Sequence, residues 1–370
     1  MSGAWRPVTR LEPADFTEVW RAASERNAAA VERSPIVARG RDLSWIETPN
    51  EHRLGMLIGE QVGFPTNGTN LCKVIVPAGT HTGRHRHGEE ALHVLRGRGA
   101  ALIGGRRYDI RPGTTLHVPY LDDHQLVNLG DEELEVVTAS TIDLDLFIRL
   151  GRYEQLEPKG DNSTSFLAAL PDEDGQFDAL ERRIALHFED APNETERRAR
   201  SGKHGDGHGH GHHAAPAAAA DHDRGTRAVT HRAGRLIKSE HPHRHGAIYD
   251  LMGGGESKHE HRNGFTSITV AMTQIFEEVP HTSSHDHTHT EAVLYVLEGV
   301  GYSEIDGVHY DWEAGDAVQI PPKMTRHEHF NPSDGRTRTL RIEYGIRYFY
   351  EQLWPGYFKI EHRETSVARP

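Results

Sequence analysis

The sequence holds two sets of histidines whose spacing suits a metal ion. Each set begins with two histidines that stand two residues apart, and a third follows 37 residues later in the first set and 38 later in the second. In a β-strand, residues i and i+2 point to the same face, so each pair can offer two imidazoles to one ion. Three neutral nitrogen ligands leave positions open for water, O₂ or substrate, and they suit Fe(II), Mn, Co, Ni or Zn. The sets are His85, His87 and His124, then His287, His289 and His327.

These sets are part of a longer internal repeat. Gly97 and Gly299 are 202 residues apart, and Gly113 and Gly315 share that offset, as do Pro119 and Pro321. The offset becomes 203 at the third histidine and at the pair Asn128 and Asn331, which indicates one inserted residue. Many pairs of identical residues separated by nearly the same number of positions predict a tandem duplication of one domain.

Short apolar, β-branched runs broken by Gly, Pro, Asn and Asp fill both halves from residue 70 onwards, which is typical of an all-β sandwich or barrel. Residues 13–34 are rich in Ala, Glu and Arg and predict a helix, and a second, charged helix is expected over 178–200. Residues 201–227 are low in complexity and predict a disordered linker.

The residues resemble the two motifs of the cupin family. Motif one reads as Gly79, then His85 and His87, Glu90, and Gly97. Motif two reads as Pro112 and Gly113, then His124 and Asn128, and the second repeat carries its own copies of both motifs. The resemblance implies an all-β fold of two tandem cupin barrels (double-stranded β-helix, jelly-roll), a bicupin, with an N-terminal helix and inter-domain helices.

The two repeats differ at the fourth ligand position of the family pattern. In repeat one this position holds Glu90, which can complete the ligand set or be a surface acid beside Glu89. In repeat two it holds Ala292, and strand alternation points the neighbouring Glu291 to the opposite face. A histidine-only set with Ala at that position resembles gentisate 1,2-dioxygenase-like ring-cleaving dioxygenases, although the loop is one residue shorter here and His281 replaces the leading Gly.

Several residues beside the ligands are candidates for substrate contact. His329 follows His327 by two residues and can replace it as a ligand or face the pocket as an acid or base. Arg84 and Arg326 could anchor a carboxylate, although strand parity points them away from the adjacent ligands. His93 and Tyr295 occupy equivalent strand positions and are expected to pack. Asn128 and Asn331 are expected to shape turns.

Composition limits the function classes. The net charge of −13 argues against nonspecific nucleic-acid binding, and no apolar run is long enough to span a membrane. The single cysteine, Cys72, excludes an intramolecular disulfide, and the N-terminus shows no secretory signal, so a cytoplasmic location is expected. Ten of the 28 histidines lie between 200 and 245, mostly in the chain expected to be unstructured, and five of them lie among glycines: His204, His208, His210, His212 and His213. For these five, metal buffering and an inert spacer are both open interpretations.

Together these features predict a non-haem metal-dependent dioxygenase that uses O₂, with Fe(II) as the expected metal, on a small, acidic, hydroxylated aromatic substrate. One alternative is a Mn-, Zn- or Ni-dependent decarboxylase or isomerase of a small carboxylate or sugar, which Glu90 as a ligand would favour. Another is a non-enzymatic, metal-linked binding protein. A homo-oligomer is compatible with exposed barrel edges. The expected domains are an N-terminal helical extension (1–60), barrel one (61–160), a connecting helix (161–200), the linker (201–230) and barrel two (231–370).

Overall fold

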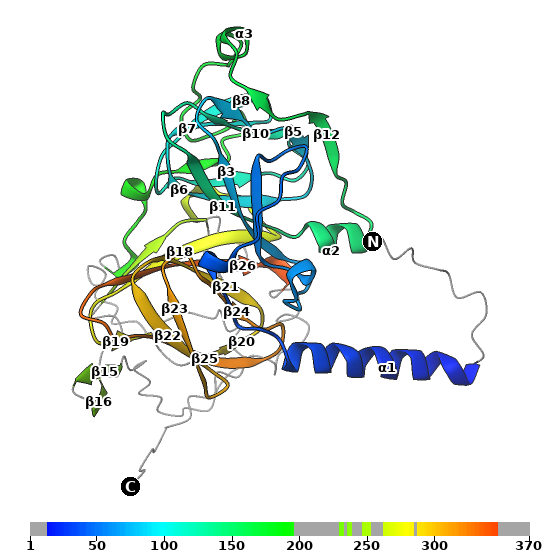
Figure 1. Cartoon of the computed structure of the whole chain (residues 1–370), viewed down its shortest axis with the longest axis vertical. Helices are drawn as coiled ribbons and strands as arrows, with labels where there is room; N and C mark the ends of the chain where they lie inside the picture. The colour runs from blue at the N-terminus through cyan, green and yellow to red at the C-terminus, as the bar shows by residue number, and fades with distance from the viewer. Residues whose placement is uncertain are drawn as a thin grey trace, which may run out of the picture.

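The computed structural model describes residues 13–195, 229–232, 235–238, 246–252, 262–284 and 287–346. The described residues form two β-barrels that lie one above the other, with the N-terminal helix α1 (Pro13–Glu32) projecting to one side (Figure 1). The predicted all-β fold of two tandem jelly-roll barrels is confirmed. None of the described helices combines the length and the apolarity needed to cross a membrane.

Barrel 1 is built from two sheets. Its inner sheet faces the other barrel, and its outer sheet carries the first histidine set. The inner sheet contains, in spatial order, β14 (Ala185–Leu186), β9 (Thr115–Val118), β6 (Glu90–Arg96), β11 (Leu134–Ser140), β3 (Asn70–Val76) and β2 (Arg53–Ile58). The outer sheet contains β12 (Glu154–Glu157), β5 (Arg84–Arg86), β10 (His124–Asn128), β4 (Thr80–His81) and β13 (Gly160–Asp161), with β7 (Gly99–Ile103) and β8 (Arg106–Ile110) attached through β10.

Barrel 2 repeats this plan, as the duplication predicts. Its inner sheet contains β1 (Val37–Ala38), β24 (Ala317–Ile320), β21 (Ala292–Glu298), β26 (Thr337–Tyr344), β18 (Val270–Glu278) and β17 (Gly246–Asp250). Its outer sheet contains β19 (Thr282–Ser283), β25 (Thr325–Asn331), β22 (Val300–Ile305), β23 (Val308–Glu313) and β20 (His287–His289). A separate hairpin joins β15 (Val229–Arg232) and β16 (Arg235–Lys238). The short helices are α2 (Ile142–Phe147) and α3 (Thr164–Ala168), with 3-10 turns at Gly40–Asp42, Glu60–Val62, Phe188–Asp190 and Arg262–Gly264.

Three apolar cores result from strand alternation. Residues such as Leu92 and Val94 fill barrel 1, and Leu294 and Val296 fill barrel 2 in the same way. Side chains on the opposite faces of the two inner sheets meet in a third core between the barrels. The two barrels are therefore joined through a buried apolar interface.

The outermost strand of each inner sheet comes from the segment that precedes the other barrel. Strand β1 precedes barrel 1 but pairs with β24 of barrel 2, and β14 precedes barrel 2 but pairs with β9 of barrel 1. The two contacts are equivalent: the Gln319 N–H donates to the Ile36 carbonyl at 2.8 Å, and the His117 N–H donates to the Ile184 carbonyl at 2.9 Å.

Two predictions for the flanking segments are wrong. The helix expected over 178–200 does not form across 178–193, where Ile184 and the following strand β14 are fully buried against barrel 1. Burial on both faces of this strand outweighs the helix propensity of the charged residues around it. Residues 33–60, expected in a helical extension, contribute β1 and β2 instead. The other domain boundaries stay a prediction, and most of the linker, with its histidines His204, His208, His210, His212 and His213, lies outside the described residues.

Candidate metal centre

Two neighbouring strands of the outer sheet bring the first histidine set together. His85 lies in the middle of β5, His87 follows that strand directly, and His124 begins β10. In the pairing of β5 with β10, His85 lies directly opposite His124. Because residues alternate along β5, His85 is buried while Arg84 and Arg86 point outward.

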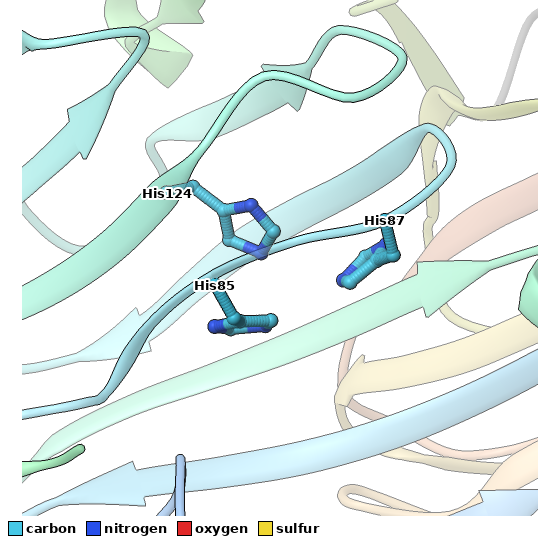
Figure 2. Close-up of side chains that lie close together, drawn as sticks. All are labelled: His85, His87 and His124. Atoms are coloured by element: carbon cyan, nitrogen blue, oxygen red, sulfur yellow. The ribbon is translucent and has the colours of Figure 1, made fainter. Parts of the chain in front are cut away.

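The three imidazoles converge on one point (Figure 2). One possible ligand atom from each lies within 4.8 Å of the other two, and all three residues are buried. The ring centroids of His85 and His124 are 4.2 Å apart, and those of His87 and His124 are 4.8 Å apart. The predicted triad of barrel 1 therefore exists as a compact cluster.

Glu90, the first residue of β6, brings a carboxylate into this cluster. Its Oε2 lies 3.1 Å from Nε2 of His124 and 3.7 Å from Nε2 of His87. Burial alone would raise the pKa of Glu90, but the contacts with His124, His87 and Thr138 outweigh burial and lower this pKa to about 2. The carboxylate is therefore ionised and buried beside the imidazoles, not exposed on the surface.

Hydrogen bonds to the backbone fix the tautomer of each imidazole. The Nδ1 atoms of His85, His87 and His124 lie 3.1, 3.1 and 3.3 Å from the carbonyl oxygens of residues 83, 88 and 122. A carbonyl oxygen only accepts, so each Nδ1 carries the proton and each Nε2 presents a lone pair. This is the second-shell arrangement of metal-binding histidines.

The resulting site is suited to a cation. Burial, together with the neighbouring His124, lowers the pKa of His85 to about 3, and burial lowers the pKa of His87 to about 4, so both rings are neutral near pH 7. Nε2 of His124 is buried without a hydrogen-bond partner and faces an ionised carboxylate oxygen. Three imidazole nitrogens and this carboxylate oxygen surround one buried point, so the residues present fit a bound metal ion.

Barrel 2 repeats the second-shell pattern. His287 of β20 pairs with His327 of β25, as His85 does with His124. The rings of His289 and His327 lie 4.3 Å apart, and their Nδ1 atoms lie 2.5 and 2.9 Å from the carbonyl oxygens of Thr290 and Thr325. These carbonyls stand at the same sequence offsets as those in barrel 1. Two imidazoles are thus arranged as ligands, and the side chain of His287 lies outside the described residues.

Glu291 points away from the histidines of barrel 2, as strand parity predicts. It is fully buried and accepts hydrogen bonds from the Asn67 N–H at 3.2 Å and the Thr69 hydroxyl at 2.9 Å, both from the other half of the chain. Burial raises the pKa of Glu291 to about 7. Ala292, which belongs to the barrel 2 core, occupies the position equivalent to that of Glu90 in barrel 1.

The two predicted arginines do not reach the sites. Arg84 forms ion pairs with Asp123 at 3.2 Å and Glu157 at 2.5 Å on the outside of barrel 1. Arg326 is exposed on the face of β25 opposite to His327. Both arginines lie on the strand face opposite to the adjacent histidine, because regular strand alternation persists at both positions.

His329 lies on the same face of β25 as His327, and the two rings are 5.4 Å apart. Its Nδ1 lies 2.7 Å from the hydroxyl oxygen of Ser303. Burial, with the charge of Arg341, lowers the pKa of His329 to about 3. The side chain is thus a neutral group beside the barrel 2 histidines.

The remaining candidates have packing roles. His93 is buried with Nδ1 2.9 Å from the Thr115 hydroxyl, and Tyr295 lies in the core between the barrels. The side-chain amide of Asn128 donates to the carbonyls of Val76 and Glu132 at 2.8 and 2.7 Å, and Asn331 makes the corresponding bonds in barrel 2. Both asparagines therefore close turns, as expected.

Sequence reasoning missed an aromatic residue beside the barrel 1 cluster. Tyr153 lies just before β12, with its ring 5.9 Å from that of His87 and nearly parallel to it, and its hydroxyl contacts the side-chain amide of Asn50. The segment 153–158 (YEQLEP) has an echo at 350–355 (YEQLWP), which marks it as part of the repeat. This repetition is the signal in the sequence that could have identified Tyr153.

Comparison with known proteins agrees with this geometry. The model of the cupin domain matches residues 72–140 and 274–343. The chain therefore carries two cupin domains in tandem and is a bicupin. An uncharacterized protein of Methanocaldococcus jannaschii is 30% identical over 73 residues, a match that spans 19% of this chain and 58% of that protein's length.

Solved bicupin structures share the fold at low sequence identity. A mutant oxalate decarboxylase of Bacillus subtilis has a TM-score of 0.56 at 13% identity, covering 84% of this chain and 77% of its own. The formate complex of Lactobacillus farciminis oxalate decarboxylase has a TM-score of 0.54 at 12% identity, covering 84% and 86%. A salicylate 1,2-dioxygenase from Pseudaminobacter salicylatoxidans has a TM-score of 0.52 at 14% identity, covering 90% and 84%. These structures show the fold of the chain, and the histidine cluster of barrel 1 indicates a site for a divalent metal ion.

Proposed function

We propose that this bicupin is a dioxygenase that cleaves the ring of a small hydroxylated aromatic acid, with Fe(II) as its metal. One observation carries the proposal: in barrel 2, Ala292 replaces the carboxylate of Glu90, while His289 and His327 keep the tautomer of metal ligands. A ligand set of neutral imidazoles leaves the full charge of a divalent ion to attract an anionic substrate.

The protein's own residues would hold the reactants in place. The histidines of barrel 2 would fix the ion through Nε2, and His329 would offer a polar contact beside it. A bound Fe(II) would supply the redox chemistry that joins O₂ to the aromatic ring. Holding both reactants in one buried site makes a bimolecular step effectively intramolecular. The fold shared with a salicylate 1,2-dioxygenase supports this proposal.

A second function is favoured by the cluster in barrel 1. Glu90 places an ionised carboxylate 3.1 Å from Nε2 of His124, which would give a mixed set of three nitrogens and one oxygen. Such a set lowers the net charge of the site and suits Mn(II). Decarboxylation of a small carboxylate at this site is the matching reaction, and the fold shared with oxalate decarboxylases supports it.

The same assay separates the two functions. The protein is purified anaerobically without a tag, its metals are measured by mass spectrometry, and O₂ uptake and CO₂ release are followed with gentisate, salicylate, hydroquinone, catechol and oxalate. Ring cleavage consumes one O₂ per aromatic substrate. Iron-loaded protein that consumes no O₂ with any aromatic would rule out the first function, and CO₂ release from oxalate without net O₂ consumption would establish the second. Metal binding with neither reaction would indicate a binding protein.

A cytoplasmic location for the reaction stays a prediction. The expected partners are the acidic aromatic substrate and O₂, and a homo-oligomer stays a prediction.

A further inference from the structure

The interiors of the two barrels differ at three equivalent positions. In barrel 1 these positions hold Ala101, Ile110 and Leu126, and all three belong to its apolar core. In barrel 2, at offsets of 202, 202 and 203 residues, they hold Ser303, Trp312 and His329. Barrel 2 therefore has polar groups where its duplicate is purely apolar.

These polar groups form a chain of hydrogen bonds. The indole Nε1–H of Trp312 donates to Oγ of Ser303 at 3.0 Å, and the same oxygen lies 2.7 Å from Nδ1 of His329. Ser303 has no exposed surface, so its hydroxyl proton cannot be satisfied by bulk water. Among the described residues, Trp312 and His329 are the partners of that hydroxyl group.

The direction of the chain follows from the chemistry of its members. An indole N–H only donates, so Ser303 accepts from Trp312 and keeps its own proton to give away. If Nδ1 of His329 also donated to Ser303, the buried hydroxyl proton would have no acceptor, which is unfavourable. Ser303 therefore donates to Nδ1, and His329 carries its proton on Nε2.

This tautomer is opposite to that of the neighbouring ligands. His289 and His327 donate from Nδ1 to carbonyl oxygens and present lone pairs at Nε2. His329 presents an N–H at Nε2, and such an atom cannot bind a metal ion. The interpretation of His329 as a replacement ligand is therefore not favoured, and its N–H suits an anionic oxygen instead.

We propose that Ser303 and Trp312 are positioning residues that hold His329 as an Nε2–H donor toward an oxygen of the substrate bound in barrel 2. Because Ala101, Ile110 and Leu126 give barrel 1 no such donor, the aromatic acid is recognised in barrel 2 and not in barrel 1. This inference rests on the proposed dioxygenase function for the identity of the substrate, but not for the tautomer.

The experiment measures the tautomer of His329 and the binding of the aromatic acid separately. Protein labelled with ¹⁵N-histidine is loaded with Zn(II), and the His329 signals are assigned by their loss in H329Q. The variants are S303A, which installs the barrel 1 residue, and W312F, which removes only the indole N–H. The matched control is A101S, which adds a hydroxyl at the equivalent place in barrel 1. The affinities for gentisate and for salicylate are measured on Fe(II)-loaded protein without O₂.

We expect a protonated Nε2 on His329 in the wild type and in A101S, and a shift toward the Nδ1–H form in S303A and W312F. Gentisate affinity should fall roughly fivefold in S303A, the effect of one hydrogen bond, and stay unchanged in A101S. A wild-type His329 protonated on Nδ1 overturns the inference whether or not gentisate binds. Unaltered gentisate affinity in both S303A and H329Q also overturns it. If the tautomer is as expected but neither gentisate nor salicylate binds, the positioning of His329 stands and the proposed substrate is wrong.

Discussion

Glu89 and Glu291 stand 202 residues apart, and each buried carboxylate crosses the interface to bind the other half of the molecule. Glu89 accepts from the Ile268 N–H at 2.9 Å, and Glu291 accepts from the Asn67 N–H at 3.2 Å. Both carboxylates directly precede the strand that follows a histidine pair, so each candidate site is tethered to the opposite barrel. A duplicated sequence has thus produced a reciprocal pair of contacts.

Removing one of these carboxylates should destabilise the protein. Glu89→Ala would leave the N–H groups of Ile268 and Thr269 and the ring of His117 without their acceptor in a buried place. We expect the free energy of unfolding in urea to fall by about 3 kcal/mol. Glu132→Ala, which removes an exposed partner of Arg96, should change it by less than about 0.5 kcal/mol. Equal effects of the two substitutions would contradict the buried contact.

The two metal sites should be separable by mutation. His87→Ala and His289→Ala should each lower the metal content by about one ion per chain, because each removes one imidazole from one barrel. His309→Ala, which removes an exposed histidine paired with Asp311, is the matched control and should leave the metal content unchanged. Mass spectrometry of purified protein checks this. A substitution that leaves the metal content unchanged shows that its barrel holds no ion.

Glu90 should matter for the metal of barrel 1 alone. Glu90→Gln removes the negative charge beside His87 and His124 but keeps the size of the side chain. We expect the affinity of barrel 1 for Mn(II) or Fe(II) to fall at least about tenfold, while the affinity of barrel 2 stays constant. Competition with a chelator measures both. Glu157→Gln, on the outer surface beside Arg84, is the control. If Glu90→Gln leaves both affinities unchanged, Glu90 is not a ligand.

His93 should make the protein sensitive to acid. Burial, with the charge of Arg338, lowers the pKa of His93 from 6.5 to about 4. Between these values the unfolded chain binds a proton that the folded protein does not, so stability falls as the pH falls from 6.5 to about 4. The shift corresponds to about 3 kcal/mol at most. His93→Gln should show a smaller loss of unfolding free energy over this range in urea titrations at several pH values. An identical pH dependence would show that His93 titrates normally.

The fold and the barrel 1 cluster could be predicted from the sequence because the chain contains two copies of one domain, and the two copies can be compared with each other. Residues that keep nearly one offset through a duplication carry a shared constraint, and His85 and His124, at offsets of 202 and 203 residues, are among them. The spacing also indicated the face of Glu291 correctly, since strand alternation is a local property.

The remaining features depend on contacts that the local pattern does not encode. The segment around Ala185 has the composition of a charged helix, yet it forms a strand because an open sheet edge of barrel 1 is available to it. His281 stands where repeat one has Gly79, and it still adopts a left-handed backbone, with φ of 61° beside 73° for the glycine. The chain of Trp312, Ser303 and His329 joins three separate strands, and no spacing rule connects them.

The exchanged edge strands have a consequence for the history of the chain. Because β1 closes the sheet of barrel 2 and β14 closes that of barrel 1, neither half could be lost after the duplication without stripping a strand from the survivor. A barrel that lost its catalytic activity would therefore still be retained, because the other barrel needs its strand to complete a sheet. One barrel can then accumulate substitutions in its binding site while the other keeps its function. The difference between Leu126 in barrel 1 and His329 in barrel 2 is a substitution of this kind.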